Sequence, residues 1–153
     1  MKQRKGGIDI SSSLEDFLNG KRSVDDLFDG CINGEERCRL LWELSETRPG
    51  LIYKRWKELE RLLDSDEPYK LSTALNVIAN LSLVDSKDNM TKLLERYFDN
   101  LDNDILVAAR YTAMNAGKIG RYKPGLRRYV TKKLLDIDRT HHVEGIKDMI
   151  KGD

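Results

Sequence analysis

The sequence predicts an all-α fold in which helical hairpins stack into a short α-α superhelix. Three observations lead to this prediction. Apolar residues recur with helical spacing, no stretch alternates with the period of two that strands show, and one helical pattern repeats along the chain. A chain of 153 residues with 39% apolar content is long enough for one domain with its own core.

Capping signals divide the chain into short helices. Near the N-terminus, Ser12, Ser23 and Asn33 each precede an acidic residue by three positions, which is the pattern of a capping box. Further on, Asp66 and Asp104 are expected to start helices, with Pro68 in a first turn. Helix ends are expected at Gly20, Gly30, Gly50 and Gly120.

Four amphipathic stripes follow one another between residues 52 and 137. Each stripe has apolar residues three or four positions apart, which places them on one face of a helix. A continuous core is therefore expected. Its predicted members are Leu63, Leu75, Ile78, Leu94, Phe98, Ala113 and Val130.

One of these patterns recurs after 38 residues. The segment LDSDEPYKLSTALNVIANL, at 63–81, aligns with LDNDILVAARYTAMNAGKI, at 101–119. A hairpin that recurs at this interval cannot bury its apolar stripes alone, so it stacks on its neighbours. We expect a right-handed solenoid of about three hairpins, at 33–65, 66–101 and 102–138. An N-terminal cap at 1–32 and a C-terminal capping helix at 139–153 would complete the single domain.

The third hairpin, DILVAARYTAMNAGKIGRYKPGLRRYVTKKLLDID at 104–138, resembles a HEAT repeat. In that family the first helix opens with Asp, carries small residues and often Arg, and ends near a glycine. The matching positions are Arg110, Ala113, Ala116, Gly117 and Gly120. The resemblance implies an armadillo-like α-solenoid that presents a curved surface to a partner. The tetratricopeptide repeat is the alternative, but its Trp, Leu-Gly, Tyr and Pro placements are not found.

The stretch Gly-Lys-Ile-Gly at 117–120 is interpreted as the terminus of the first helix of this repeat. A GxxG loop clamps nucleic acid in KH domains, but that fold contains strands. A P-loop needs GxxxxGK[ST] after a buried strand. The sequence shows neither context.

No residue pattern indicates catalysis or metal binding. Cys31 and Cys38 are interpreted as buried reduced thiols, because their spacing matches no zinc or redox motif. His141 and His142 are adjacent and cannot share a metal on a helix; they are expected in a first turn, exposed to solvent. Trp56 is interpreted as a packing residue.

Paired carboxylates have a structural explanation as well. Asp64 with Asp66, and Asp102 with Asp104, are interpreted as helix caps and turn residues rather than as acid-base pairs. We therefore predict a protein without enzymatic activity, cofactor or metal.

The net charge of +1 selects no partner, but the charges are unevenly distributed. Acids outnumber bases ten to four from Asp9 to Glu46, whereas 105–135 contains eight Lys or Arg and no acid. No apolar run approaches 18 residues and no signal sequence follows the basic start, so a cytoplasmic protein without membrane contact is expected.

The second helices of the three hairpins share two basic positions. Aligned on Leu59, Leu94 and Val130, these positions lie on the solvent side of each helix. We call them the basic ladder: Lys57, Lys92 and Arg128, then Arg61, Arg96 and Lys132. In a HEAT-like stack this side lines the concave surface.

The ladder suggests a non-enzymatic interaction scaffold that binds a protein partner through an acidic segment. The alternative is a nucleic-acid-binding module that uses the ladder and the basic C-terminal half. A third interpretation is a solvated helix face, partly neutralised by Glu60 and Glu95.

Overall fold

A computed structural model describes residues 10–28, 34–140, 142 and 144–151. This part of the chain contains α-helices, short 3-10 helices and turns, and no strand, so the all-α prediction is confirmed. The α-helices are α1 (Ile10–Leu18), α2 (Gly34–Thr47), α3 (Trp56–Leu62), α4 (Pro68–Leu81), α5 (Asn89–Phe98), α6 (Leu106–Tyr122), α7 (Arg127–Leu135) and α8 (Glu144–Lys151).

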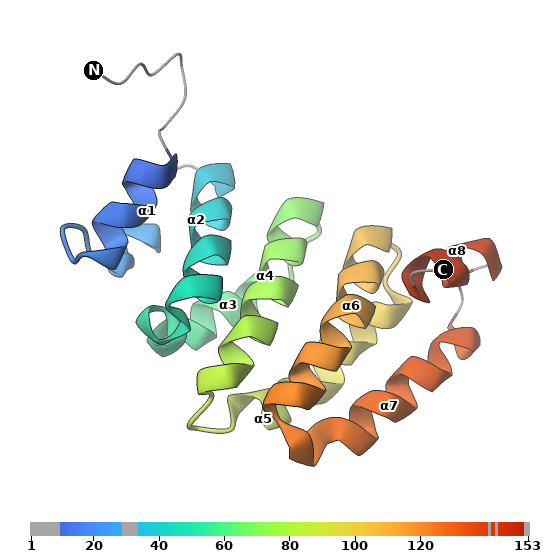
Figure 1. Cartoon of the computed structure of the whole chain (residues 1–153). Helices are drawn as coiled ribbons and strands as arrows, with labels where there is room; N and C mark the ends of the chain where they lie inside the picture. The colour runs from blue at the N-terminus through green and yellow to red at the C-terminus, as the bar shows by residue number, and fades with distance from the viewer. Residues whose placement is uncertain (1–9, 29–33, 141, 143, 152–153) are drawn as a thin grey trace.

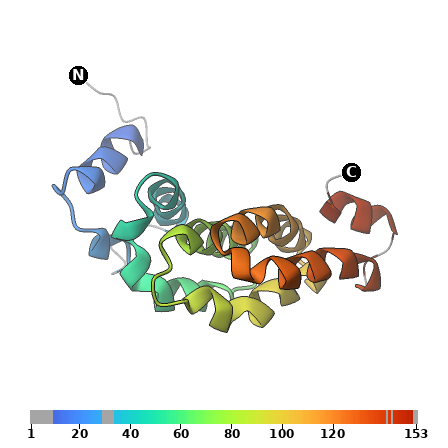
Figure 2. The ribbon, with the colours of Figure 1, turned by 60° about the horizontal axis from the view of Figure 1, so that its bottom comes forward.

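The helices form two layers. Helices α2, α4 and α6 lie side by side, with α4 between the other two (Figure 1). Helices α3, α5 and α7 form the second layer, and α1 and α8 lie at the two ends (Figure 2). Both terminal helices lie on the side of α2, α4 and α6, so the stack curves toward that first layer (Figure 2).

The predicted core is largely confirmed. Helix α4 is the central element, and every residue from 71 to 81 is buried because helices cover it on both sides. Ala113 is only partly buried but packs against the same cluster. The other predicted core residues are all buried, namely Leu63, Leu75, Ile78, Leu94, Phe98 and Val130. A fully buried side chain of this kind contributes about 1.5–3 kcal/mol to stability.

Polar side chains join the first-layer helices to one another. The Asn80 amide donates to the Ser45 hydroxyl at 2.8 Å, and the Lys118 ammonium donates to the Asn80 carbonyl oxygen at 2.6 Å. Asn115 similarly donates to Asn76 at 3.1 Å. The bonded residues lie 35 to 39 positions apart. These bonds satisfy buried amides, which otherwise cost free energy.

A buried carboxylate, Asp85, holds three parts of the chain together. Its oxygens accept hydrogen bonds from the Tyr53 hydroxyl at 2.5 Å and from the Asn89 and Met90 amides at 2.8 Å each. The Lys123 ammonium lies 3.3 Å away. Burial by itself raises the pKa of Asp85, but the hydrogen bonds outweigh burial and keep that pKa below the ordinary value of 3.8. Asp85 therefore begins α5 and links it to the segments that carry Tyr53 and Lys123.

Helix starts differ from the prediction by one residue. Asp66 and Asp104 do not cap α4 and α6. The side-chain oxygens of Ser65 and Asn103 instead accept from the amides two positions further on, at 3.0 and 2.8 Å. These oxygens form local turns that lead into the helices. Pro68 does lie in the first turn of α4, and Ser23 caps a 3-10 helix (Val24–Leu27). The Ser12 side chain and Asn33 lie outside the described residues.

Two of the four glycines predicted at helix ends lie elsewhere. Gly20 does follow α1 with a φ of +80°, where glycine is favoured. Gly50 lies inside a short 3-10 helix (Pro49–Leu51), and Gly120 lies inside the last turn of α6. A Cβ at Gly120 would lie 3.4 Å from the Arg127 side chain, so this glycine allows close packing of α7. The Gly-Lys-Ile-Gly stretch is therefore part of α6 and not its terminus. Gly30 lies outside the described residues.

Candidate functional site

The six residues of the basic ladder are all exposed, with two on each second-layer helix. Helix α3 carries Lys57 and Arg61, α5 carries Lys92 and Arg96, and α7 carries Arg128 and Lys132. The two cations of a helix are four residues apart, which corresponds to about 6 Å along the axis. The sequence therefore places all six side chains correctly in solvent.

Arg96 differs from the others because it is engaged within the protein. Its guanidinium lies 2.7 Å from the Asp64 carboxylate and donates to the Glu60 carbonyl at 3.0 Å. The Glu60 side chain in turn accepts from the Trp56 indole at 2.6 Å. Arg96 thus joins α5 to the end of α3, and its charge is largely compensated.

The other five ladder residues form no hydrogen bond or ion pair through their side chains with any described residue. These are Lys57, Arg61, Lys92, Arg128 and Lys132. Exposed acids also occur on the second-layer helices or directly after them, namely Asp64, Glu95 and Asp99. Apart from Arg96, the ladder residues are therefore cations without an ion pair to a described residue, and such a surface attracts an anionic group presented by another molecule.

The ladder lies on the outer side of the curved helix stack, which differs from the expectation of a concave site. Its helices form the second layer, whereas the stack curves toward α2, α4 and α6 (Figure 2). Trp42 of α2 and Tyr111 of α6 meet edge to face, with ring centroids 5.8 Å apart, although α4 lies between their helices. First-layer helices therefore approach closely, and the second-layer face is the outer one.

Two more lysines lie beside the ladder. Lys54 and Lys87 line a cavity of about 140 Å³ together with Lys57, and both are exposed. Lys54 is also 4.0 Å from Asp25. Lys54 precedes Lys57 by three residues, and this helical spacing could have identified Lys54 as a neighbour of the ladder from the sequence. Lys87 is brought there only by the packing of the loop before α5.

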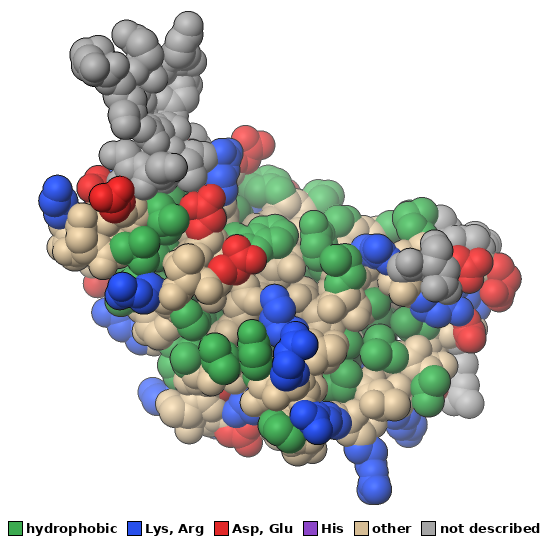
Figure 3. Space-filling view, in the orientation of Figure 1, with side chains coloured by type: hydrophobic (Ala, Val, Ile, Leu, Met, Phe, Trp, Pro, Cys, Tyr) green, Lys and Arg blue, Asp and Glu red, His purple; other side chains and the backbone are tan. Residues whose placement is uncertain are grey.

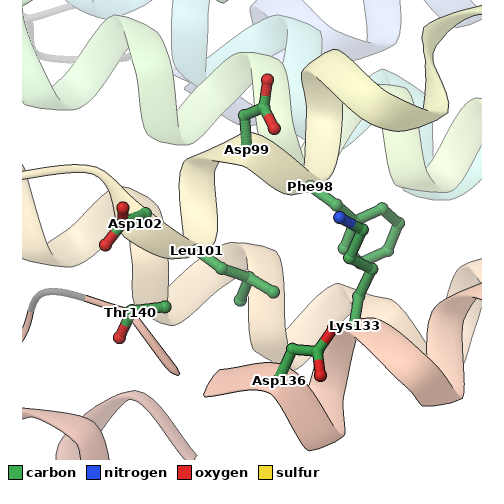
Figure 4. Close-up of a pocket in the computed structure, with 7 residues that line it drawn as sticks. All are labelled: Phe98, Asp99, Leu101, Asp102, Lys133, Asp136 and Thr140. Atoms are coloured by element: carbon green, nitrogen blue, oxygen red, sulfur yellow. The ribbon is translucent and has the colours of Figure 1, made fainter. Parts of the chain in front are cut away.

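A second cavity, of about 160 Å³, lies between the end of α5 and the end of α7 (Figure 4). Asp99, Asp102 and Asp136 line it with Lys133. The three carboxylates come from different sides and do not converge on one point (Figure 4). No group of three or more potential metal ligands occurs among the described residues. The cavity thus offers no metal centre.

Three of the residues considered for chemistry in the sequence are buried in the structure. His142 is buried, with its Nε2 atom 3.0 Å from the Leu101 carbonyl, so the prediction of an exposed histidine is wrong for this residue. Leu101 belongs to the 3-10 helix Asp99–Asp102 that follows α5. Cys38 is a buried free thiol and Trp56 is a buried packing residue, as predicted. Cys31 and His141 lie outside the described residues.

The chain matches no protein-family model, no curated protein and no solved structure. The HEAT-like resemblance therefore remains a prediction. Within the described segments, no helix is both long and apolar enough to cross a bilayer.

Proposed function

We propose that this protein is a non-enzymatic interaction scaffold that binds an acidic segment of a protein partner on the outer face of α3, α5 and α7. The observation that carries the proposal is the set of five exposed ladder cations without a carboxylate partner among the described residues. Exposed basic residues are common, but these recur at the same two positions of successive helices.

The scaffold we infer is a short, right-handed, HEAT-like solenoid. Its support is the set of hydrogen bonds between repeat-related positions. Ser45, Asn80 and Lys118 occupy related sites in successive hairpins and bond in sequence across α2, α4 and α6. Side chains that bond to their own counterparts in the next unit are expected of stacked repeats, in which each unit contacts its neighbours.

An acidic peptide fits this face better than a nucleic acid does. Glu95 is exposed on α5, and Asp99 is exposed directly after it. Both would repel a continuous phosphate backbone, whereas the carboxylates of a peptide can be spaced to avoid them. Single-stranded nucleic acids also require aromatic platforms for stacking. The only exposed aromatic side chain among the described residues is Tyr69, which lies on α4 in the other layer.

The test compares two variants with the same change in net charge. Lys57→Glu with Lys92→Glu removes two ladder cations, and Lys21→Glu with Arg39→Glu removes two exposed cations elsewhere. Both ladder substitutions place an acid in the first turn of a helix, where it is favoured, so the fold should be preserved. The probe is a fluorescein-labelled peptide of twelve glutamates, measured by fluorescence anisotropy.

The ladder variant should bind the peptide about tenfold more weakly than the unaltered chain. Each exposed charge pair contributes roughly 0.2–1 kcal/mol, and each substitution replaces an attraction by a repulsion. The affinity of the control variant for the peptide should fall less than about twofold. If both variants lost the same affinity, binding would depend on net charge alone, and the proposal would be refuted. Tighter binding to a DNA duplex of equal charge, with the same ladder dependence, would favour the nucleic-acid alternative.

A further inference from the structure

The groove between α6 and α7 lies at the C-terminal edge of the helix stack. It has a volume of about 390 Å³. Small residues of α6 form one wall and α7 forms the other. The wall residues are Ala116, Gly117 and Gly120 on α6, and Val130, Thr131 and Leu134 on α7. Beyond the groove, Leu135 is 75% exposed. Of these wall residues, Ala116, Gly120 and Val130 are buried, Leu134 is half-buried, and Gly117 and Thr131 are exposed.

The preceding hairpin shows what covers the related positions. The residues related to Ala116, Gly117 and Gly120 by the 38-residue repeat are Ile78 and Ala79 of α4 and Ser82, which follows α4 directly. All three are at most 1% exposed, and α6 is one of the helices that pack against α4. On α6, by contrast, Gly117 is exposed, and no described helix other than α6 and α7 lines the groove. Helix α8 packs near Arg110, which donates to the Met149 carbonyl at 2.6 Å, and α8 does not line the groove.

The backbone at the groove leaves room for a close neighbour. A Cβ atom built on Gly117 would meet no atom within 4 Å, and Gly117 itself is exposed. A glycine in a helix allows another helix to approach closely, at a cost to helix stability of about 1 kcal/mol relative to alanine. The shape thus fits a helix with small or apolar residues along one stripe.

The charges of the groove indicate which polar groups the helix carries. Arg121 and Arg127 line it and both are exposed, and no acid of the described residues lines it. The Nε atom of Arg127 donates to the Gly120 carbonyl at 3.0 Å, and its terminal nitrogens bond to no described residue. Between α6 and α7, the surface shows hydrophobic side chains and Lys or Arg, but no Asp or Glu (Figure 3). A carboxylate on the bound helix would therefore find a cation.

We propose that this groove binds an amphipathic helix of another protein, with a small or apolar stripe flanked by Asp or Glu. The helix would take the place that α6 occupies on α4 and would extend the stack by one element. This surface is separate from the basic ladder and does not depend on it.

The test uses two synthetic 21-residue helices and one groove-filling variant of the full chain. Both helices carry Ala and Leu at positions i, i+3, i+4 and i+7, with either Glu or Lys at the flanking positions. Gly117→Leu fills the groove where there is open space, and Gly50→Leu is the matched control because its Cβ also meets no atom within 4 Å. Binding is measured by isothermal titration calorimetry, and self-association by sedimentation velocity.

The Glu helix should bind the unaltered chain at least tenfold more tightly than the Lys helix. Gly117→Leu should weaken that binding at least tenfold, whereas Gly50→Leu and the ladder variant Lys57→Glu/Lys92→Glu should leave it within twofold. Equal binding of the two helices, absence of binding, or insensitivity to Gly117→Leu would overturn the proposal. A dimer that Gly117→Leu dissociates would also overturn it, because the occupant would then be a second copy of this chain.

Discussion

Replacing Asp85 by asparagine tests whether one buried carboxylate holds the hairpins together. The substitution keeps the shape of the side chain but removes its charge. Asparagine can still accept hydrogen bonds through one oxygen, but its amide group would face donors, such as the Met90 amide and the Lys123 ammonium. At least two of the interactions made by Asp85 should therefore be lost.

The expected loss is about 3 kcal/mol of unfolding free energy at pH 7. Hydrogen bonds to a charged group contribute about 1.5–3 kcal/mol each. Because the Asp85 side chain is fully buried, water cannot replace the hydrogen bonds that are lost. For a chain of this length, such a loss lowers the melting temperature by roughly 6–12 °C. Urea unfolding followed by circular dichroism at 222 nm measures the free energy directly.

The matched control is Asp88→Asn. Asp88 lies 3.3 Å from the same Lys123 ammonium, but its side chain is 62% exposed. Asparagine also tolerates the positive φ of 54° at this position. The control should lose less than about 1 kcal/mol, because exposed ion pairs contribute little. If Asp85→Asn lost less than about 1 kcal/mol of unfolding free energy, or no more than the control, the stabilising role assigned to Asp85 would be refuted.

Three further predictions follow from individual side chains. Because the folded-state pKa of Asp85 is lowered, its stabilisation is present above the ordinary pKa of 3.8 and is lost as the pH falls through the lower folded value. The difference between the unaltered chain and Asp85→Asn in urea unfolding should therefore shrink between about pH 5 and pH 2. Tyr97→Phe should cost about 1 kcal/mol by the same assay, since the buried hydroxyl donates to the Leu75 carbonyl at 2.7 Å. Because burial raises the pKa of Tyr97 far above its usual range, this phenol should also stay protonated in an alkaline absorbance titration until the protein unfolds. Gly20→Ala should cost about 1 kcal/mol because φ is +80°, whereas Gly50→Ala, without a positive φ, should be neutral or slightly stabilising; equal effects would contradict the backbone argument.

Local patterns in the sequence were sufficient to locate most of the helices. The spacing of Met90, Leu93, Leu94, Tyr97 and Phe98 predicts α5, and all of these residues are buried. The 38-residue repeat likewise predicts that α4 and α6 are equivalent. These features depend on positions three or four apart or on direct self-similarity, so they can be read without knowing which helices meet.

The basic ladder could be predicted only in part. Exposure of its six residues follows from helical periodicity, because each lies opposite an apolar stripe. The pairing of Arg96 with Asp64, 32 residues away, does not follow from periodicity, since it requires α5 to lie beside the end of α3. The side of the molecule on which the ladder lies also depends on how the two layers curve.

The sequence by itself thus determined the all-α class, the positions of the helices and most of the core, because helix formation and amphipathicity are local properties. Only the tertiary structure decided the partners of the buried polar groups. Asp85, Asn80 and His142 look like ordinary surface or turn residues in the sequence, yet all three are buried. Each of the three has a hydrogen-bond partner more than 30 residues away, and only the packing of whole helices brings such groups within 3 Å of each other.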